Sequence, residues 1–334
     1  MRARHLGLCL LLAAASSSAQ EPKPGDPAPR RGDEMIVCGR LIHTTTPIVT
    51  WLDPGGYDAY RVDRRVVVAE ESAAEKAKAK AEPSGLPATR FGLRKAGLSA
   101  EQVEKAQAEG WDLPLLQQAV DQFVLHFDAC GTSRKCFEVL QDERGLSVHF
   151  MLDLDGTIYQ TLDLKEAAWH ATKANGRSIG IEIANIGTFR PDAAGSPKVA
   201  RWYQPDAGGK TRITLPDPTA LPAASRSMVL RPDRDRPVVG RVQGEELAQY
   251  DLTPQQYESL IKLTAALCRT FPKIRCDYPR TPEGAVAPAK LADDLYSGYA
   301  GILGHYHVQS NKVDPGPAFQ WDRLVDGARA LMAR

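Results

Sequence analysis

The sequence has no excess of charge of either sign. Its 334 residues include 42 Lys and Arg against 41 Asp and Glu, which leaves a formal net charge of +1. Proteins that bind nucleic acid usually carry a strongly basic face, so this balance gives no electrostatic case for a nucleic-acid partner. The length allows one large domain or two small ones.

An apolar run long enough to cross a bilayer is also missing near the N-terminus. Residues 6–15 are apolar, but this run is shorter than the ~20 residues that a membrane helix needs. The run follows Arg2 and Arg4 and precedes small and polar residues, which is the order of a secretory signal. We therefore expect residues 1–19 to be a signal peptide, and the mature chain to have no membrane span and to reach the periplasm or the extracellular space. A buried N-terminal helix is the alternative.

No two cysteines have the C-x-x-C spacing, so a zinc knuckle held by cysteines is not supported. Five cysteines would remain after removal of the signal. In an oxidising compartment, the closely spaced pairs Cys130/Cys136 and Cys268/Cys276 can form disulfides. Cys38 would then be left over, either free or paired between molecules.

The rest of the sequence is organised into three segments and an insertion, with no internal repeat. We predict a flexible, Pro-rich linker at 20–34, an N-terminal extension of strands and helices at 35–115 with a helix at 70–82, a main domain at 116–330, and a Pro-, Gly- and Arg-rich insertion at about 187–249. Strand patterns alternate with helix patterns in the main domain. This order predicts an α/β fold with a single mixed β-sheet flanked by helices.

Three stretches carry strand patterns. Residues 121–127 alternate, with Phe123 and Leu125 on one face and His126 on the other. Residues 178–185 alternate as well, with Glu182 facing away from a row of isoleucines. Two apolar runs flank Asp155-Gly156, which predicts a β-hairpin.

Two capping boxes predict helix starts. Ser99 is followed by Gln102, and Thr253 is followed by Gln256. We expect the second helix to bury a stripe formed by Tyr257, Leu260, Ile261, Thr264 and Leu267.

The histidines suggest a metal site. A catalytic zinc ion takes three protein ligands and keeps one position open for water. His126 is a candidate ligand because it lies on the face of its strand opposite the large apolar residues. Packing of the core does not require a histidine on that face. One of His305 and His307 could join it, since two residues so spaced on a strand face opposite sides. Asp314, held on a Pro-Gly-Pro turn, could be the third ligand.

Two further residues could act beside such a metal. Glu182 is a candidate general base, because a carboxylate on an apolar strand is costly unless a cation lies near it. Lys312, two residues before Asp314, could stabilise a developing oxyanion. From spacing alone, a purely structural role for these residues is the alternative.

Five blocks of sequence, in this order, resemble the zinc N-acetylmuramoyl-L-alanine amidases. This family shares a fold with phage lysozyme-type amidases and peptidoglycan recognition proteins. The resemblance covers residues 121–185 and 250–325. The blocks are "VLHFDACGTSRKC", "SVHFMLDLDGTIYQ", "AAWHA", "SIGIEIAN" and "GHYHVQSNKVDPGPAFQW".

The resemblance implies Zn²⁺ as the cofactor. It places the zinc ligands on His126, His305 and Asp314, and the stretch before the second ligand selects His305 over His307. His307 and His149 match positions that are not ligands, so we expect both to be structural.

The resemblance also implies the roles of the residues around the metal. It places the catalytic residues on Glu182 and Lys312, and it places His170, with the preceding Trp169, in the substrate pocket. Val148 stands where phage-type members have a tyrosine, so Glu182 is expected to carry the proton transfer.

The function implied is an exported zinc amidase that cleaves the amide between N-acetylmuramic acid and L-alanine, acting as a monomer on peptidoglycan or muropeptides. Cys130 and Cys136 resemble a short disulfide loop of the recognition proteins. The alternatives are a non-catalytic peptidoglycan-binding module and a cytoplasmic recycling amidase. The insertion at 187–249 either edges the substrate groove or is a solvated loop without function.

Overall fold

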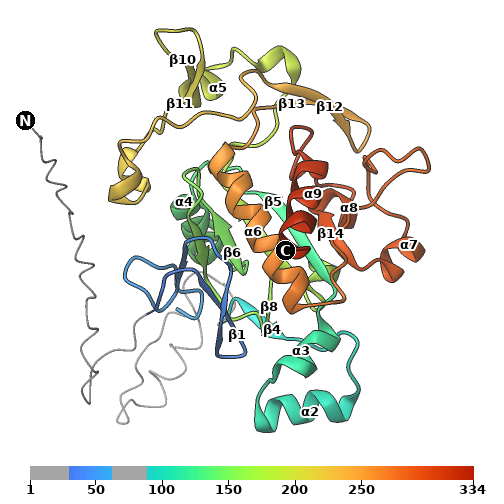
Figure 1. Cartoon of the computed structure of the whole chain (residues 1–334). Coiled ribbons are helices and arrows are strands. Elements are labelled where there is room, and N and C mark those ends of the chain that lie inside the picture. The colour runs from blue at the N-terminus through green and yellow to red at the C-terminus, as the bar shows by residue number, and fades with distance from the viewer. Residues whose placement is uncertain (1–29, 62–88) are drawn as a thin grey trace, which may run out of the picture. The chain divides into compact units, whose positions relative to one another are not determined.

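The computed structural model describes residues 30–61 and 89–334 (Figure 1). The predicted signal peptide at 1–19, most of the predicted linker and the helix predicted at 70–82 lie outside the described residues. Within the two described stretches, no helix is both long and apolar enough to cross a membrane.

A six-stranded mixed sheet lies at the centre of the described chain. β14, β5, β9 and β6 run parallel, β7 is antiparallel to β6, and β3 is parallel to β7. The prediction of a single mixed sheet flanked by helices is confirmed for this centre. In spatial order the strands are β14 (Gly301–Gly304), β5 (Gln122–Phe127), β9 (Ser178–Ile183), β6 (Phe150–Leu152), β7 (Ile158–Gln160) and β3 (Ile48–Thr50).

The alternation along β5 and β9 places apolar residues on one face of the sheet and polar residues on the other. Phe123, Leu125, Ile179 and Ile181 are buried in one core cluster with residues of α6 (Pro254–Thr270) and α9 (Trp321–Met332). These two helices pack on each other and cover that face (Figure 1). The same period turns the polar residues of β5 and β9 to the opposite face, as the sequence predicts.

The predicted local signals form as expected. Ser99 and Thr253 each close a capping box with the glutamine three residues later. The turn at Asp155 and Gly156 joins β6 to β7. Of the predicted stripe on α6, Ile261 is half-buried and the other four residues are buried.

Shorter elements surround the sheet. The two-stranded sheets are β1 (Glu34–Val37) with β2 (Arg40–His43), β4 (Phe91–Leu93) with β8 (Glu166–Ala168), β10 (Tyr203–Pro205) with β11 (Thr211–Ile213), and β12 (Val238–Val242) with β13 (Glu245–Gln249). The remaining α-helices of the described residues are α2 (Ala100–Glu109), α3 (Leu113–Ala119), α4 (Ser133–Glu138), α5 (Pro197–Trp202), α7 (Asp293–Gly298) and α8 (His305–Val308), and α4 runs on into the π-turn η1 (Val139–Arg144).

The insertion at 187–249 folds around a small core of its own. Val199, Tyr203 and Ile213 are buried there together with Leu154 and Ala184 of the main domain. Elements α5, β10 and β11 form its first part, and the hairpin β12–β13 forms its second. The insertion is therefore ordered on the main domain.

Candidate metal centre and active site

Three neighbouring parallel strands end side by side and carry the candidate residues. Gly304, the last residue of β14, pairs with Leu125, and His126 pairs with Glu182. His305 follows Gly304 directly, so a row of three functional side chains crosses β14, β5 and β9. The carboxyl ends of parallel strands are where α/β proteins commonly build their sites.

The structure corrects one detail of this row. His305 and His307 lie in the short helix α8 and not on a strand, as the sequence analysis assumed. They still point to different places. The Gly304 N–H donates to Nδ1 of His307 (2.9 Å), and Nε2 of His307 lies 2.9 Å from the Ala287 carbonyl oxygen, so His307 is structural as predicted.

The three predicted metal ligands converge and are buried. Nδ1 of His126 lies 3.0 Å from Nδ1 of His305 and 2.9 Å from Oδ2 of Asp314. Nδ1 of His305 lies 2.9 Å from the same carboxylate oxygen. Two ring nitrogens and one carboxylate oxygen therefore face one point.

The partners on the far side of each imidazole bear on which ring nitrogen carries the proton. Nε2 of His305 lies 2.7 Å from Oε1 of Gln309, which can only accept, so this nitrogen carries the proton and Nδ1 keeps its lone pair. Nε2 of His126 lies 2.9 Å from Nδ1 of His170, and Nε2 of His170 lies 3.1 Å from Oγ of Ser178. The same tautomer in His126 would have its Nε2 donate to His170 and His170 donate to Ser178, and it would leave the Nδ1 lone pair of His126 facing inward as well.

These donors fit a zinc ion. Two lone pairs and a carboxylate oxygen so close together repel one another unless a cation lies between them. Tetrahedral zinc, with bonds of about 2.0–2.1 Å, places its ligand atoms about 3.3 Å apart, so the three atoms need to move only a few tenths of an ångström. Burial, followed by the nearby His305, lowers the pKa of His126 to about 4, which keeps this ligand neutral. Burial raises the pKa of Asp314, but the neighbouring His305 and His126 outweigh it and hold that pKa below its usual value.

A cavity of about 350 Å³ opens beside these ligands. Glu182, Lys312, Trp169 and His170 line it, and we call it the His126 cavity. Burial, followed by the Asp314 and Asp128 carboxylates, raises the pKa of Glu182 well above its usual value, while Lys312 lowers it. A carboxylate with a raised pKa beside a cationic side chain is suited to taking up and returning a proton.

The hairpin β12–β13 braces the segment that carries the ligands. Nε2 of Gln243 donates to the carbonyl oxygens of Tyr306 (2.9 Å), Gln309 (2.9 Å) and Lys312 (3.3 Å). Gln249 holds the turn after Asp314 in a similar way. Its Nε2 donates to the Pro315 carbonyl oxygen (3.0 Å), and its Oε1 accepts from the Ala318 N–H (3.1 Å).

The turn leaves no room for a side chain beside this brace. Gly316 has a φ of +90°, and a Cβ there would come within 2.1 Å of Oε1 of Gln249. The Pro-Gly-Pro turn therefore depends on its glycine both for the backbone conformation and for the approach of Gln249.

His149 is structural, as the sequence predicts. Its Nδ1 accepts a hydrogen bond from the Gly180 N–H (3.0 Å), and its Nε2 lies within 3.0 Å of both the Glu166 carbonyl oxygen and the Arg94 guanidinium. Val148, in the position of the family tyrosine, is fully buried.

Sequence reasoning missed several supporting residues. Gln309 had a usable signal, because it follows His305 by one helical turn and so shares its face. Gln243, Gln249 and Ser178 had none, because only the folded chain brings them to the ligands.

The predicted disulfides are not present. The thiols of Cys130 and Cys136 are hydrogen-bonded to each other, as are those of Cys268 and Cys276, but every cysteine of the described residues is a free thiol. The close spacing brought each pair into contact, and a bond would further require oxidation. Cys38 is also free and half-buried.

Comparison with family models identifies one family. Residues 116–317 match the family model described as N-acetylmuramoyl-L-alanine amidase. No curated protein matches the chain. Solved structures similar to it include a selenomethionine derivative of AmpD, with 16% identity, 72% of this chain and 92% of that chain covered, and a TM-score of 0.33. Another is LysC, an N-acetylmuramoyl-L-alanine amidase from Clostridium intestinale, with 17% identity, 64% of this chain and 88% of that chain covered, and a TM-score of 0.33. A third is the amidase AmiD from E. coli in complex with an anhydro-N-acetylmuramic acid peptide, with 19% identity, 62% of this chain and 57% of that chain covered, and a TM-score of 0.33.

Proposed function

Because residues 116–317 match its model, the chain belongs to the N-acetylmuramoyl-L-alanine amidase family, and we propose that it is an exported, zinc-dependent member of that family. Membership indicates hydrolysis of the amide between N-acetylmuramic acid and L-alanine of peptidoglycan. The observation that carries the zinc proposal is the convergence of two Nδ1 nitrogens and one carboxylate oxygen at distances of 2.9–3.0 Å.

His126, His305 and Asp314 would hold the zinc ion. When bound, zinc supplies Lewis acidity, which polarises a carbonyl oxygen and lowers the pKa of a water molecule toward ~7. Gln309 would hold His305 in the tautomer that zinc binding requires, and the side-chain contacts that link His126 to His170 and His170 to Ser178 would do the same for His126. His170 would position His126 through this contact, and it also lines the His126 cavity, where the resemblance places it in substrate binding.

The remaining chemistry belongs to two residues of the His126 cavity. Glu182 takes a proton from the attacking water and returns it to the leaving L-alanine amine. Lys312 faces the same space and stabilises the negative charge that develops on the carbonyl oxygen. Trp169 lines this cavity and offers an apolar surface to the substrate.

The order of charged, apolar and small residues in 1–20 supports export. Sequencing the mature N-terminus of protein isolated from its native host tests this point. We keep the prediction of a monomer, which the mass in solution would test.

One digestion tests the activity. The chain from Gln20 to Arg334 is incubated with purified peptidoglycan, with a chelator, and with the chelator followed by zinc. New L-alanine amino termini that disappear with the chelator and return with zinc are the expected result. New reducing sugar ends would indicate a glycosidase and contradict the proposal. Binding of zinc and peptidoglycan without any release would instead indicate a non-catalytic binding module.

A further inference from the structure

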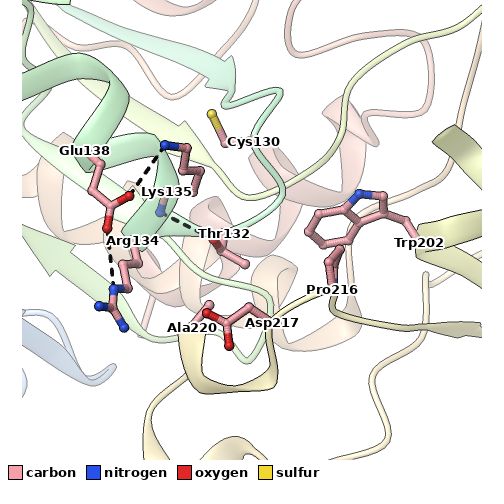
Figure 2. A pocket seen from close by; sticks show the side chains of 9 residues that line it. All are labelled: Cys130, Thr132, Arg134, Lys135, Glu138, Trp202, Pro216, Asp217 and Ala220. Carbon is pink, nitrogen blue, oxygen red and sulfur yellow. Dashed lines mark hydrogen bonds and ion pairs between the residues drawn. The ribbon is translucent and has the colours of Figure 1, made fainter. Parts of the chain in front are cut away.

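We propose that a second cavity, beside the His126 cavity, is a subsite for a neutral sugar of the glycan strand. It is lined by Trp202 of the insertion and by α4, and we call it the Trp202 cavity (Figure 2). The preferred substrate would then carry at least one sugar beyond the muramic acid at which the amide is cut. This inference rests on the proposed function and adds a substrate class to it.

The two cavities are adjacent. Cys130 lines both of them, and it lies on the loop that leaves β5 directly after the metal ligand His126. The Asp128 carboxylate fixes this loop by accepting the N–H groups of Cys130 (2.9 Å) and Gly131 (2.8 Å). A polymeric substrate with its amide at His126 therefore has a path over this loop into the Trp202 cavity.

The loop is shaped around the Trp202 ring. Gly131 has a φ of +84°, and a Cβ there would come within 2.4 Å of the indole carbon Cη2. Any other residue would push the ring away, so the glycine lets Trp202 lie directly against the loop. Pro216 lies beside the ring, and Ala220 adds apolar surface elsewhere in the same cavity, next to Asp217 (Figure 2). One face of a pyranose ring exposes C–H bonds, which pack well on the electron-rich face of an indole.

The charges at the rim favour a neutral ligand. Arg134 and Lys135 are offset by Glu138 and Asp217, and both cations lie close to Glu138 (3.6 and 3.5 Å). A carboxylate of the stem peptide would meet acidic and basic groups in equal number and gain little. The hydroxyl and acetamido groups of a sugar can donate to the acidic groups and accept from the basic ones, with Thr132 available for either role.

The size selects a single ring. The Trp202 cavity has a volume of about 250 Å³. This is below the ~300–1,000 Å³ of pockets that enclose a whole drug-sized ligand, so it suits one unit of a longer substrate. The neutral N-acetylhexosamine that neighbours muramic acid in the glycan strand has this size and chemistry.

The test compares two soluble substrates that differ by one sugar. These are N-acetylmuramoyl-L-alanyl-D-isoglutamine and the same compound with N-acetylglucosamine attached to the muramic acid. We expect wild-type kcat/KM to be roughly three- to tenfold higher for the disaccharide, which is the range of a single aromatic contact. Trp202→Ala should reduce this ratio to about one, and Trp202→Phe should restore part of it.

Arg201→Ala is the matched control, because Arg201 is exposed on the same helix and does not line the cavity. It should keep the wild-type ratio. An unchanged ratio in a folded Trp202→Ala protein would overturn the subsite, even though both substrates are cleaved. If wild type cleaves neither substrate, the proposed function fails separately. The subsite is then decided by the change in indole fluorescence with the disaccharide substrate, which should occur in wild type and be lost in Trp202→Phe. No change in wild type would overturn it.

Discussion

Glu182→Gln should abolish turnover and at the same time stabilise the fold. The glutamine has nearly the same shape, but it cannot accept the proton of the attacking water. Loss of a positioned general base costs ~10²–10⁴-fold in rate, so kcat on peptidoglycan should fall by at least about 100-fold. Zinc content should remain at the wild-type level, because Glu182 is not one of the three converging ligands.

The gain in stability follows from the raised pKa of Glu182, which burial and the Asp314 and Asp128 carboxylates produce. Each unit of such a shift corresponds to about 1.4 kcal/mol of destabilisation once the group is ionised. We therefore expect the zinc-free variant to be more stable than wild type by about 1 kcal/mol or more at pH 8. For a domain of this size, that gain raises the Tm by roughly 2–4 °C.

The dependence of the stability difference on pH shows its direction. Below the unfolded pKa of 4.5, Glu182 is protonated in both states, and wild type and variant should be equally stable. As the pH rises from 4.5 toward the raised folded pKa, only the unfolded wild-type chain ionises, so the advantage of the variant grows; above the folded pKa both states are ionised and the advantage stays constant. Bound zinc should reduce the difference in stability between variant and wild type, because the cation stabilises the ionised carboxylate of Glu182.

Thermal denaturation of the zinc-free proteins between pH 4 and pH 8 measures this directly. Glu104→Gln is the control, since Glu104 is exposed on α2 and its loss should change neither stability nor rate. A Glu182→Gln protein that keeps wild-type turnover would remove Glu182 from the mechanism. A Tm below that of wild type at pH 8 would show that the carboxylate is not strained in the fold.

Three other substitutions test the surroundings of the centre. Gln309→Ala removes the acceptor that holds the His305 tautomer, so zinc affinity should fall about 10- to 100-fold in competition with a chromophoric chelator. Gln249→Ala removes the brace on the turn after Asp314 and should cost about 1–3 kcal/mol in urea denaturation. Arg94→Met leaves buried carbonyl oxygens unpaired, including that of Ser178, and should cost at least about 3 kcal/mol, whereas a loss below 1 kcal/mol would contradict the buried network.

Local rules predicted the strands of the sheet and the face on which His126 and Glu182 lie, whereas the choice of His305 over His307 came from the family resemblance. Alternation on β5 and β9 placed His126 and Glu182 on the face away from the apolar core, and the register of the strands then aligned them. The capping residues Ser99 and Thr253 marked the helix starts because their hydrogen bonds reach only three residues ahead.

What the sequence could not supply were contacts between distant segments. The bonds from Gln243 to α8 and the turn after it join residues that no local pattern relates. Trp202 likewise gave no signal, because its place against Gly131 depends on how the insertion folds back. The helical position of His305 was missed since the four residues of α8 are too few to show a helical period.

The pairing of β14 with β5 has a consequence for when the candidate centre forms. His126 and His305 are 179 residues apart in the chain. Bringing such distant residues together has a large entropic cost of loop closure. The contacts of the completed sheet and its packed helices offset this cost. A partly synthesised or still unfolded chain therefore holds the two halves of its hydrolytic centre apart. The candidate centre is therefore complete only when the whole domain has folded.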